Sequence, residues 1–328
     1  MESTLSADAS PVEASVPAAP GVVVAVIVDQ PTMVLEEVFG ALGAQDYSNT
    51  QVLVLLTGSD ADELEVVRQI VQATVPTAHI RQLGAHIGFG VAANTALRLV
   101  EGDSGFFLIM HDDVVMAPDA LRILVEELYR SNAGMVGPKF VEWEDSRRLQ
   151  AVGFDCDWFG ELDSAVEPHE LDQEQHDAVR DVFVLSSACV LVRADLFREV
   201  EGFEASIEFF GEDLDLCWRA HLSGARVVVV PAATARHRAS IVERLASRRS
   251  DSATLIRRAE RHRMATVVSL TGRRRLPIDL PLLVVLTFVQ AVGEIARGRW
   301  QRALAGLGGL FGLLTNIGAI TRRRSRVR

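Results

Sequence analysis

Two clusters of acidic residues have the types and spacing that catalysis requires. The first, Gly211-Glu212-Asp213-Leu214-Asp215, follows Phe209-Phe210 and is typical of the start of a helix. Gly211 permits a tight turn there, and the helix dipole favours carboxylates in a first turn. The second, His111-Asp112-Asp113, follows the apolar segment 105–110, which predicts a strand. A carboxylate cluster that ends a strand and one that opens a helix can together supply a metal site and a general base.

Alternating strand and helix patterns in the first part of the chain would position the second cluster. Residues 22–28 form a continuous β-branched run, which is typical of a strand buried on both faces of a parallel sheet. Further strands are predicted at 52–56, 79–83 and 105–110, and helices at 32–44, 61–73, 88–100 and from Pro118 onward. This order predicts an α/β fold with an open sheet that binds ligands at the carboxyl ends of its strands.

The pattern changes after Gly137-Pro138-Lys139. The segments that follow predict short strands and a long loop (140–183), strands (182–192 and 225–230, the latter closed by Pro231), short helices (194–200 and 211–223), a basic helix (241–270) and two apolar stretches (within 278–320). We therefore expect a disordered leader at 1–20, an α/β domain at 21–240 and a basic helical extension at 241–328.

Cysteine usage and the first residues indicate the compartment. Cys156, Cys189 and Cys217 match no zinc spacing, and three scattered cysteines indicate a reducing environment. Residues 1–20 hold no basic segment followed by an apolar one, so we expect no secretory signal. Both observations predict a cytoplasmic protein.

The charge is divided unevenly along the chain. Residues 1–235 carry a net charge of roughly −26, and residues 236–328 carry roughly +15. A basic tail favours an anionic partner, such as membrane phospholipid, a lipid phosphate or nucleic acid. We exclude nucleic acid because the acidic body would repel its phosphates.

The apolar stretches of the tail extend this prediction. Leu280 to Val292 has the length of a buried helix and is too short to span a membrane. Residues 303–320 are apolar and end at Arg322-Arg323-Arg324, a pattern typical of a helix at a membrane interface. We expect peripheral membrane contact, at the inner face of the cell membrane, or packing in a homo-oligomer.

Several segments, in order along the chain, resemble the motifs of one enzyme family. They are the region 26–37, GFGVAAN (88–94), LIMHDDV (108–114), GMVGPK (134–139), SACVLVR (187–193), Gly202-Phe203 with GEDLDLCWR (211–219), and the strand ending at Pro231 with His237 beyond it. Together they resemble the family 2 glycosyltransferases, and especially the bacterial rhamnosyl- and galactofuranosyl-transferase-like branch. These are inverting enzymes with the GT-A fold, a Rossmann-like open mixed sheet flanked by helices. The resemblance covers about residues 20–240.

The resemblance implies a reaction. An acceptor hydroxyl attacks the anomeric carbon of a UDP-, dTDP- or GDP-sugar, and the nucleoside diphosphate leaves. The reaction needs Mg²⁺ or Mn²⁺ to neutralise the leaving diphosphate, and a base to take the hydroxyl proton. The acceptor would be a glycan or a polyprenyl-linked sugar in the synthesis of a cell-envelope polysaccharide.

The same resemblance assigns roles to residues of both clusters. Asp113 would bind the metal, and His237 would bind the metal or the diphosphate. Asp112 and His111 would contact the donor. Asp213 would be the general base, with Glu212 orienting the acceptor or holding the base loop.

Outside the clusters, Gly88 and Asn94 would lie against the donor, because glycines let backbone approach a ligand. Many relatives carry an Asp after the second strand that contacts the nucleotide base. Leu56 stands at that place here, so Asp29 or Asp60 is expected to substitute. Asp215 is expected to be scaffold, because Arg219 lies at the i, i+4 spacing of a helical ion pair.

Two alternatives differ in reaction class. The departures at Leu56 and His111 favour a non-catalytic nucleotide-sugar- or carbohydrate-binding relative. A sugar-phosphate nucleotidyltransferase would need a glycine-rich, lysine-bearing loop after the first strand, which Asp29-Gln30-Pro31-Thr32 does not provide.

Overall fold

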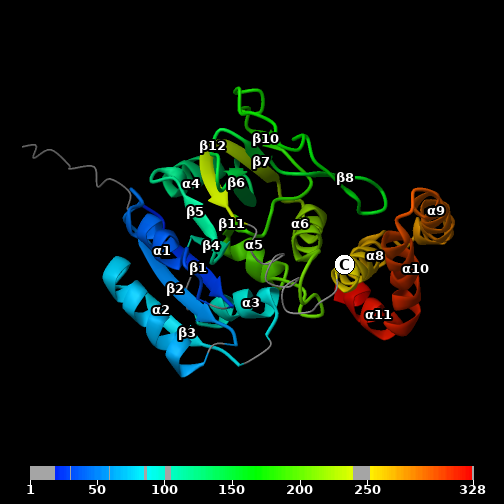
Figure 1. The fold of residues 1–328 in the computed structure, drawn as a ribbon, viewed down its shortest axis with the longest axis horizontal. Coiled ribbons are helices and arrows are strands. Elements are labelled where there is room, and N and C mark those ends of the chain that lie inside the picture. The colour runs from blue at the N-terminus through cyan, green and yellow to red at the C-terminus, as the bar shows by residue number, and fades with distance from the viewer. Residues whose placement is uncertain are drawn as a thin grey trace, which may run out of the picture.

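The computed structural model describes residues 19–29, 31–58, 60–84, 87–99, 105–238 and 252–326. Most of the expected leader, residues 1–18, lies outside this range. A mixed sheet runs through the molecule in the order β10-β12-β6-β11-β4-β1-β2-β3, with β5 beside β12 and β7 beside β6 (Figure 1).

The first part of the chain forms the predicted parallel units. They are β1 (Val22–Val28), α1 (Leu35–Gly43), β2 (Thr50–Leu56), α2 (Ala61–Thr74), β3 (His79–Gln82), α3 (Phe89–Leu99) and β4 (Phe106–His111). All seven residues of β1 are buried, as the β-branched run predicts. Asp60 caps α2 by accepting hydrogen bonds from the backbone of Asp62 and Glu63. This contact is the reason that α2 starts where it does.

The second part adds antiparallel strands to the sheet. Its elements are β5 (Val114–Met116), α4 (Ala120–Ser131), β6 (Met135–Glu142), β7 (Leu149–Ala151), β8 (Asp155–Cys156), β9 (Leu162–Asp163), β10 (Arg180–Asp181), β11 (Cys189–Arg193), α5 (Ala194–Glu199), α6 (Glu212–Leu222) and β12 (Val227–His237). β11 runs antiparallel between β4 and β6, and β12 runs parallel to β6. The sheet is therefore open and mixed.

Two predicted strand boundaries are wrong. Residues 182–188 are not part of a strand, because a turn at Ser186 intervenes, with the Cys189 amide donating to its carbonyl at 3.4 Å. The last strand does not end at Pro231 but continues to His237. Its register with β6 shifts between Val230 and Thr234, and proline is tolerated at such an irregularity because no ladder donor is needed there.

The sheet lies between two helical layers. Val22, Val24 and Val26 of β1 belong to a core shared with α1, α2 and α4. Val23 and Ala25, which alternate with them, belong to a second core shared with α3, α5 and α6. The period of two along the strand thus directs successive side chains into opposite layers (Figure 1).

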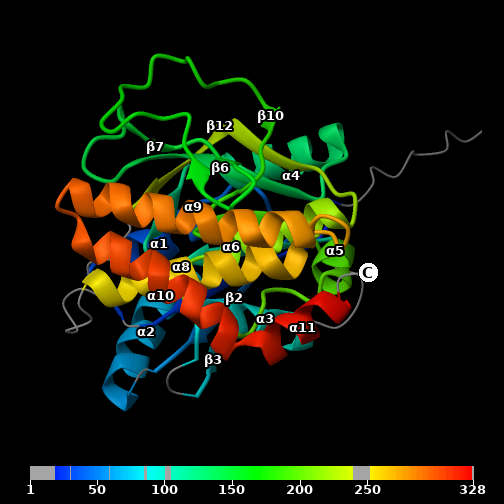
Figure 2. The same ribbon diagram turned by 90° about the vertical axis from the view of Figure 1, so that its right-hand side faces the viewer.

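Four helices of the C-terminal part pack beside α6. They are α8 (Ser252–Leu270), α9 (Leu276–Ala296), α10 (Trp300–Thr315) and α11 (Ile317–Arg326), and Figure 2 shows them facing the viewer. α10 can lie close to α8 because two of its four glycines face α8 at close range. A Cβ at Gly309 would lie 2.8 Å from Met264 Sδ, and one at Gly312 would lie 2.8 Å from Arg261 Cγ.

The apolar helix of this part is longer than predicted. α9 has 21 residues rather than the 13 or so of the apolar segment, and by length and composition it could cross a membrane. The expectation that it is too short is therefore wrong. Only 17% of its most apolar window is buried. α10 and α11 together pass the same test but are bent by 74°.

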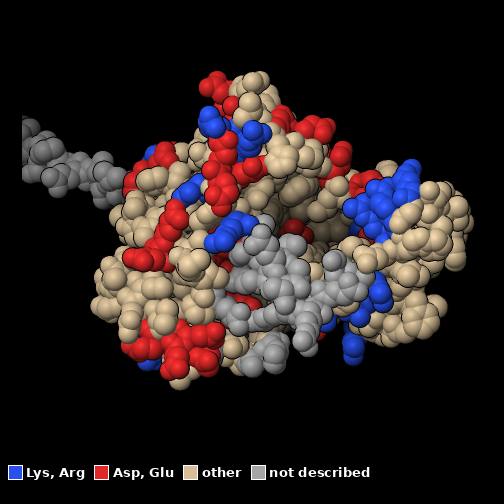
Figure 3. All heavy atoms as spheres, in the orientation of Figure 1, with Lys and Arg blue, Asp and Glu red and all other residues tan. Residues whose placement is uncertain are grey.

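A hollow separates the sheet layers from the C-terminal helices on the face drawn in Figure 3. Acidic atoms lie inside it. Arginine side chains instead gather on the C-terminal helices, between this hollow and the apolar end of the molecule.

Candidate active site

Three strand ends bring the His111-Asp112-Asp113 cluster and His237 together. β4 ends at His111, and β5 starts two residues after Asp112. In the pairing of β12 with β5, His237 lies opposite Val114, the residue that follows Asp113. The continuation of β12 beyond Pro231 therefore places His237 beside Asp113.

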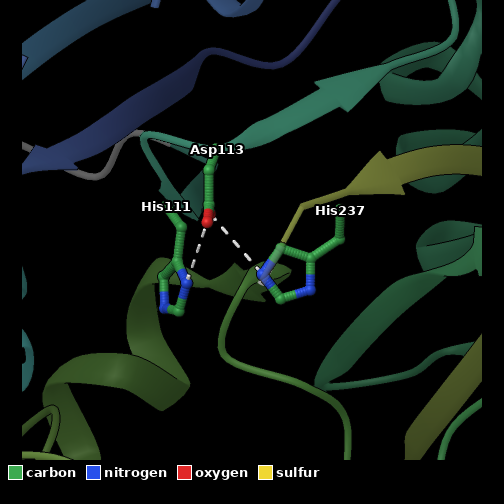
Figure 4. A group of neighbouring side chains, drawn as sticks. All are labelled: His111, Asp113 and His237. Atoms are coloured by element: carbon green, nitrogen blue, oxygen red, sulfur yellow. Dashed lines mark ion pairs between the residues drawn. The ribbon is translucent and has the colours of Figure 1, made fainter. Parts of the chain in front are cut away.

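The side chains of His111, Asp113 and His237 converge on one point (Figure 4). Asp113 Oδ1 lies 3.5 Å from His237 Nε2 and 3.9 Å from His111 Nδ1. One ligand atom from each residue lies within 4.8 Å of the others, and Asp113 is fully buried. A buried carboxylate between two imidazoles is a donor set that can hold a divalent cation.

The cluster that contains Glu212 and Asp213 opens α6. Phe210 and Gly211 have φ of +64° and +96°, so the chain enters the helix through two successive left-handed residues. Glu212 is buried, with 8% of its surface exposed, and Asp213 is half-buried. The Leu214 amide donates to Asp213 Oδ1 at 2.8 Å.

Burial changes the acidity of this pair. Desolvation raises the pKa of the Glu212 carboxyl to about 8, and the charge of Asp213 adds to the effect. Desolvation also raises the pKa of Asp213. Two adjacent carboxyls with raised pKa values are candidates for a proton-accepting group.

Ser187 and Ala188 connect the two clusters. The Ser187 hydroxyl donates to Glu212 Oε1 at 3.3 Å, while the Ala188 carbonyl accepts from the His111 amide at 2.9 Å. Because these are adjacent residues, the carboxylate pair and the histidine–aspartate cluster belong to one divided site. The sequence gives no chemical reason to single out Ser187, so it was not predicted.

Comparison with known proteins identifies the family. The family model described as "Glycosyltransferase like family 2" matches residues 18–265, well over half of the chain. The chain belongs to glycosyltransferase family 2. The resemblance inferred from the sequence motifs is therefore confirmed.

Similar proteins agree with this assignment. The chain is 28% identical over 181 residues to an N-acetylglucosaminyl-diphospho-decaprenol L-rhamnosyltransferase of Mycobacterium tuberculosis, covering 49% of this chain and 59% of that one. It is 28% identical over 154 residues to a pre-mycofactocin glycosyltransferase of the same organism, covering 46% and 30%. The chain thus spans less than two thirds of either relative.

A solved structure agrees with the fold. The crystal structure of GalNAc-T7 with UDP, GalNAc and Mn²⁺ superimposes with a TM-score of 0.56 at 10% identity, over 66% of this chain and 43% of that chain. The predicted GT-A fold is therefore confirmed.

The glycosyltransferase family also predicts donor contacts at Gly88 and Asn94, and the structure gives both residues structural contacts. Asn94 accepts a hydrogen bond from the Phe203 amide and donates one to the Phe203 carbonyl, each at 2.8 Å. A Cβ at Gly88 would lie 2.8 Å from the carbonyl oxygen of Glu208. These contacts support the segment that leads to Glu212 and Asp213. Donor binding by Gly88 and Asn94 stays a prediction.

Asp29 and Asp112 lie at carboxyl ends of the central strands. The Thr57 hydroxyl, just beyond β2, donates to Asp29 Oδ1 at 3.3 Å, so Asp29 lies between the ends of β1 and β2. Asp112, which stands between His111 and Asp113 in the sequence, is also buried. Both positions fit the edge at which open α/β sheets bind ligands, and their contacts with a donor stay predictions.

Asp215 is scaffold, as predicted. It is fully buried, and Arg219 Nε donates to its Oδ2 at 2.8 Å in the expected i, i+4 pair. Arg323 of α11 reaches its other oxygen. No local pattern in the sequence indicates this long-range partner.

Proposed function

We propose that this family 2 glycosyltransferase transfers a sugar, with inversion, from a nucleotide-sugar donor to an acceptor hydroxyl. The observation that supports it best is the divided site, in which a histidine–aspartate cluster lies beside a buried carboxylate pair. Inversion by a single displacement requires the leaving group and the attacking hydroxyl on opposite sides of the anomeric carbon. A site that binds a cation on one side and carries a general base on the other meets this geometric requirement.

Asp113, His237 and His111 would hold the divalent cation. Their donor set fits the role, because the three ligand atoms converge within 4.8 Å and include a fully buried carboxylate. A bound Mn²⁺ or Mg²⁺ supplies positive charge that stabilises the leaving diphosphate. Asp112 and Asp29 would bind the nucleotide part of the donor at the adjoining strand ends.

Asp213 would accept the proton of the attacking hydroxyl. It is more exposed than Glu212 and so can reach an acceptor in the site. Glu212 receives the Ser187 hydrogen bond and would hold the base loop in place. The pair would act while its proton acceptor is ionised, at a pH set by their raised pKa values.

We infer that the acceptor is a lipid-linked sugar and that the protein works at the inner face of the cell membrane, in cell-envelope polysaccharide synthesis. The apolar, arginine-flanked end of the C-terminal helices supports this location. The printed name of the rhamnosyltransferase relative gives a decaprenol-linked acceptor for that protein. UDP-, dTDP- and GDP-sugars are the candidate donors.

An assay with a panel of these nucleotide-sugars and Mn²⁺ tests the proposed reaction. We expect release of nucleoside diphosphate from one donor class, with loss of turnover in Asp113→Asn and Asp213→Asn. Asp195→Asn, which changes an exposed first-turn carboxylate of α5, is the matched control and should keep full activity.

The alternatives give other results in the same assay. Donor binding without turnover across the panel would show a non-catalytic relative. Formation of a nucleotide-sugar from a sugar phosphate and a nucleoside triphosphate would show a nucleotidyltransferase.

A further inference from the structure

The loop Phe209–Gly211, which carries the Glu212–Asp213 pair, has an unfavourable backbone conformation. Phe210 and Gly211 are both left-handed. For a residue with a side chain this conformation is unfavourable, and it persists only where the surroundings impose it. Something outside the loop must therefore hold it.

His262 of α8 is in contact with this loop. Its Nδ1 lies 3.0 Å from the carbonyl oxygen of Phe209 and 3.0 Å from that of Phe210. Carbonyl oxygens only accept, so Nδ1 carries the proton and donates to both. His262 is 5% exposed, and desolvation lowers the pKa of the imidazole, which keeps it neutral.

The backbone of α8 also lies against the loop. A Cβ at Gly211 would lie 3.3 Å from His262 Cβ and 3.9 Å from the Arg263 amide nitrogen. One turn earlier, Arg258 pairs with Glu208 at 3.2 Å. Arg258 and His262 are four residues apart, so they form one face of α8 directed at residues 208–210.

We propose that His262 is a positioning residue for the catalytic base, and that the C-terminal helices thereby complete the active site. The proposal rests on the proposed function for the identity of the base. By fixing two successive carbonyls, the imidazole holds the left-handed turn that directs Asp213 into the site. His262 bonds the loop before α6 and lies on a different element from His111, Asp113 and His237, so donor binding should not depend on it.

Steady-state kinetics of three variants test the proposal. His262→Phe keeps a ring but removes the donor, and we expect kcat to fall by about 10- to 100-fold while the KM for the donor stays within about twofold. In His262→Asn the amide nitrogen is as many bonds from Cα as Nδ1, so it should restore most of the lost kcat. Met264→Leu, on the face of α8 that contacts α10, is the control and should keep wild-type kinetics.

A second measurement does not need turnover. Hydrogen exchange of the amides of 209–215 should be faster in His262→Phe than in wild type and should return toward wild type in His262→Asn. If the wild type turns over no donor, the proposed function fails, and exchange alone decides the role of His262. A folded His262→Phe with wild-type kcat and wild-type exchange overturns the proposal, as does an Asn variant no better than Phe in both measurements.

Discussion

His111 and His237 would give the proposed cation site nitrogen ligands beside the carboxylate oxygen of Asp113. Mg²⁺ strongly prefers oxygen ligands in regular octahedral geometry, whereas first-row transition ions also accept imidazole. The two imidazole ligands would therefore favour Mn²⁺ over Mg²⁺.

The first prediction concerns this selectivity. After treatment with a chelator, Mn²⁺ should restore more activity than Mg²⁺ at equal concentration. His237→Ala should weaken the apparent Mn²⁺ affinity by at least about tenfold, because metal sites lose this much even when an outer-sphere partner is removed. Titration of activity with each ion measures both effects. Equal activation by the two ions would contradict the assignment of the histidines as ligands.

The second prediction concerns pH. Burial raises the pKa values of Glu212 and Asp213, so both carboxyls stay protonated at pH values where an exposed carboxyl, with a pKa of about 4, is ionised. A protonated carboxyl cannot accept the acceptor's proton, so kcat/KM should rise with pH through a range higher than that of an exposed carboxyl.

Glu212→Gln provides the comparison for that profile. It replaces the neighbouring carboxyl by a neutral amide, and the rising limb should stay where it is in the wild type, because only Asp213 must lose its proton to act as the base. Initial rates measured in buffers of constant ionic strength give both profiles. A limb at pH 4 in the wild type would mean that neither carboxyl is the buried base.

At the scale of elements, the N-terminal end of α6 is held by two residues that are distant in sequence. His262 of α8 holds the loop before it, and Arg323 of α11 binds Asp215 in its first turns. Arg323 is 7% exposed, and Glu204 lies 3.6 Å from its Nε. A buried carboxylate needs such partners because they compensate for its lost hydration.

The third prediction follows from this buried network. Arg323→Met should lower the free energy of unfolding by about 1.5–3 kcal/mol, the cost of losing a charged hydrogen bond, since Arg219 still pairs with Asp215. Urea unfolding measures the change. Arg322→Met, an exposed neighbour on the same helix, should have little effect. Equal effects of the two substitutions would show that the buried pair adds no stability.

At the scale of the whole molecule, the C-terminal helices present an apolar surface to solvent. On α9 the residues Leu283, Thr287 and Ala291 are buried against neighbouring helices. The opposite face is exposed, with Phe288 at 55%. Its exposed apolar residues, together with those of α10, are Ile278, Leu282, Val285, Phe288, Val289, Val292, Ile295, Leu304, Phe311 and Leu314. A continuous apolar surface of this kind indicates a partner.

Arginines at the ends of α9 indicate which partner. Arg273, Arg274 and Arg275 precede the helix, and Arg297, Arg299 and Arg302 follow it, all exposed. Figure 3 shows basic side chains beside the apolar end. An apolar face bordered by arginine matches the interface of an anionic bilayer, with the apolar side chains among the acyl chains and the guanidinium groups at the phosphates.

The fourth prediction is that the protein floats with vesicles containing phosphatidylglycerol and not with pure phosphatidylcholine vesicles. Val285→Glu combined with Phe288→Glu should abolish flotation, whereas Tyr129→Glu, an exposed aromatic on α4, should not. Substitution is a better test than deletion of 278–328, because deletion also removes Arg323. Concentration-dependent dimers without flotation would instead show that this surface joins two copies of the chain.

The alternating α/β order, the family motifs and the two acidic clusters could all be predicted from the amino-acid sequence. These signals are local, since periodicity, capping and short motifs each depend on residues within a few turns. The alternation of β1 between two cores and the Asp215–Arg219 pair followed from spacing alone.

The way in which the two clusters come together could be seen only in the tertiary structure. The passage of β12 through Pro231 brings His237 to Asp113, and a turn at Ser186 shortens the strand beside it. Ser187, His262 and Arg323 act on the carboxylate helix across 25, 52 and 108 positions of the chain. Such contacts depend on the packing of whole layers, and no local pattern in the sequence encodes them. The contact of His262 with the loop before α6 therefore became visible only in the folded molecule.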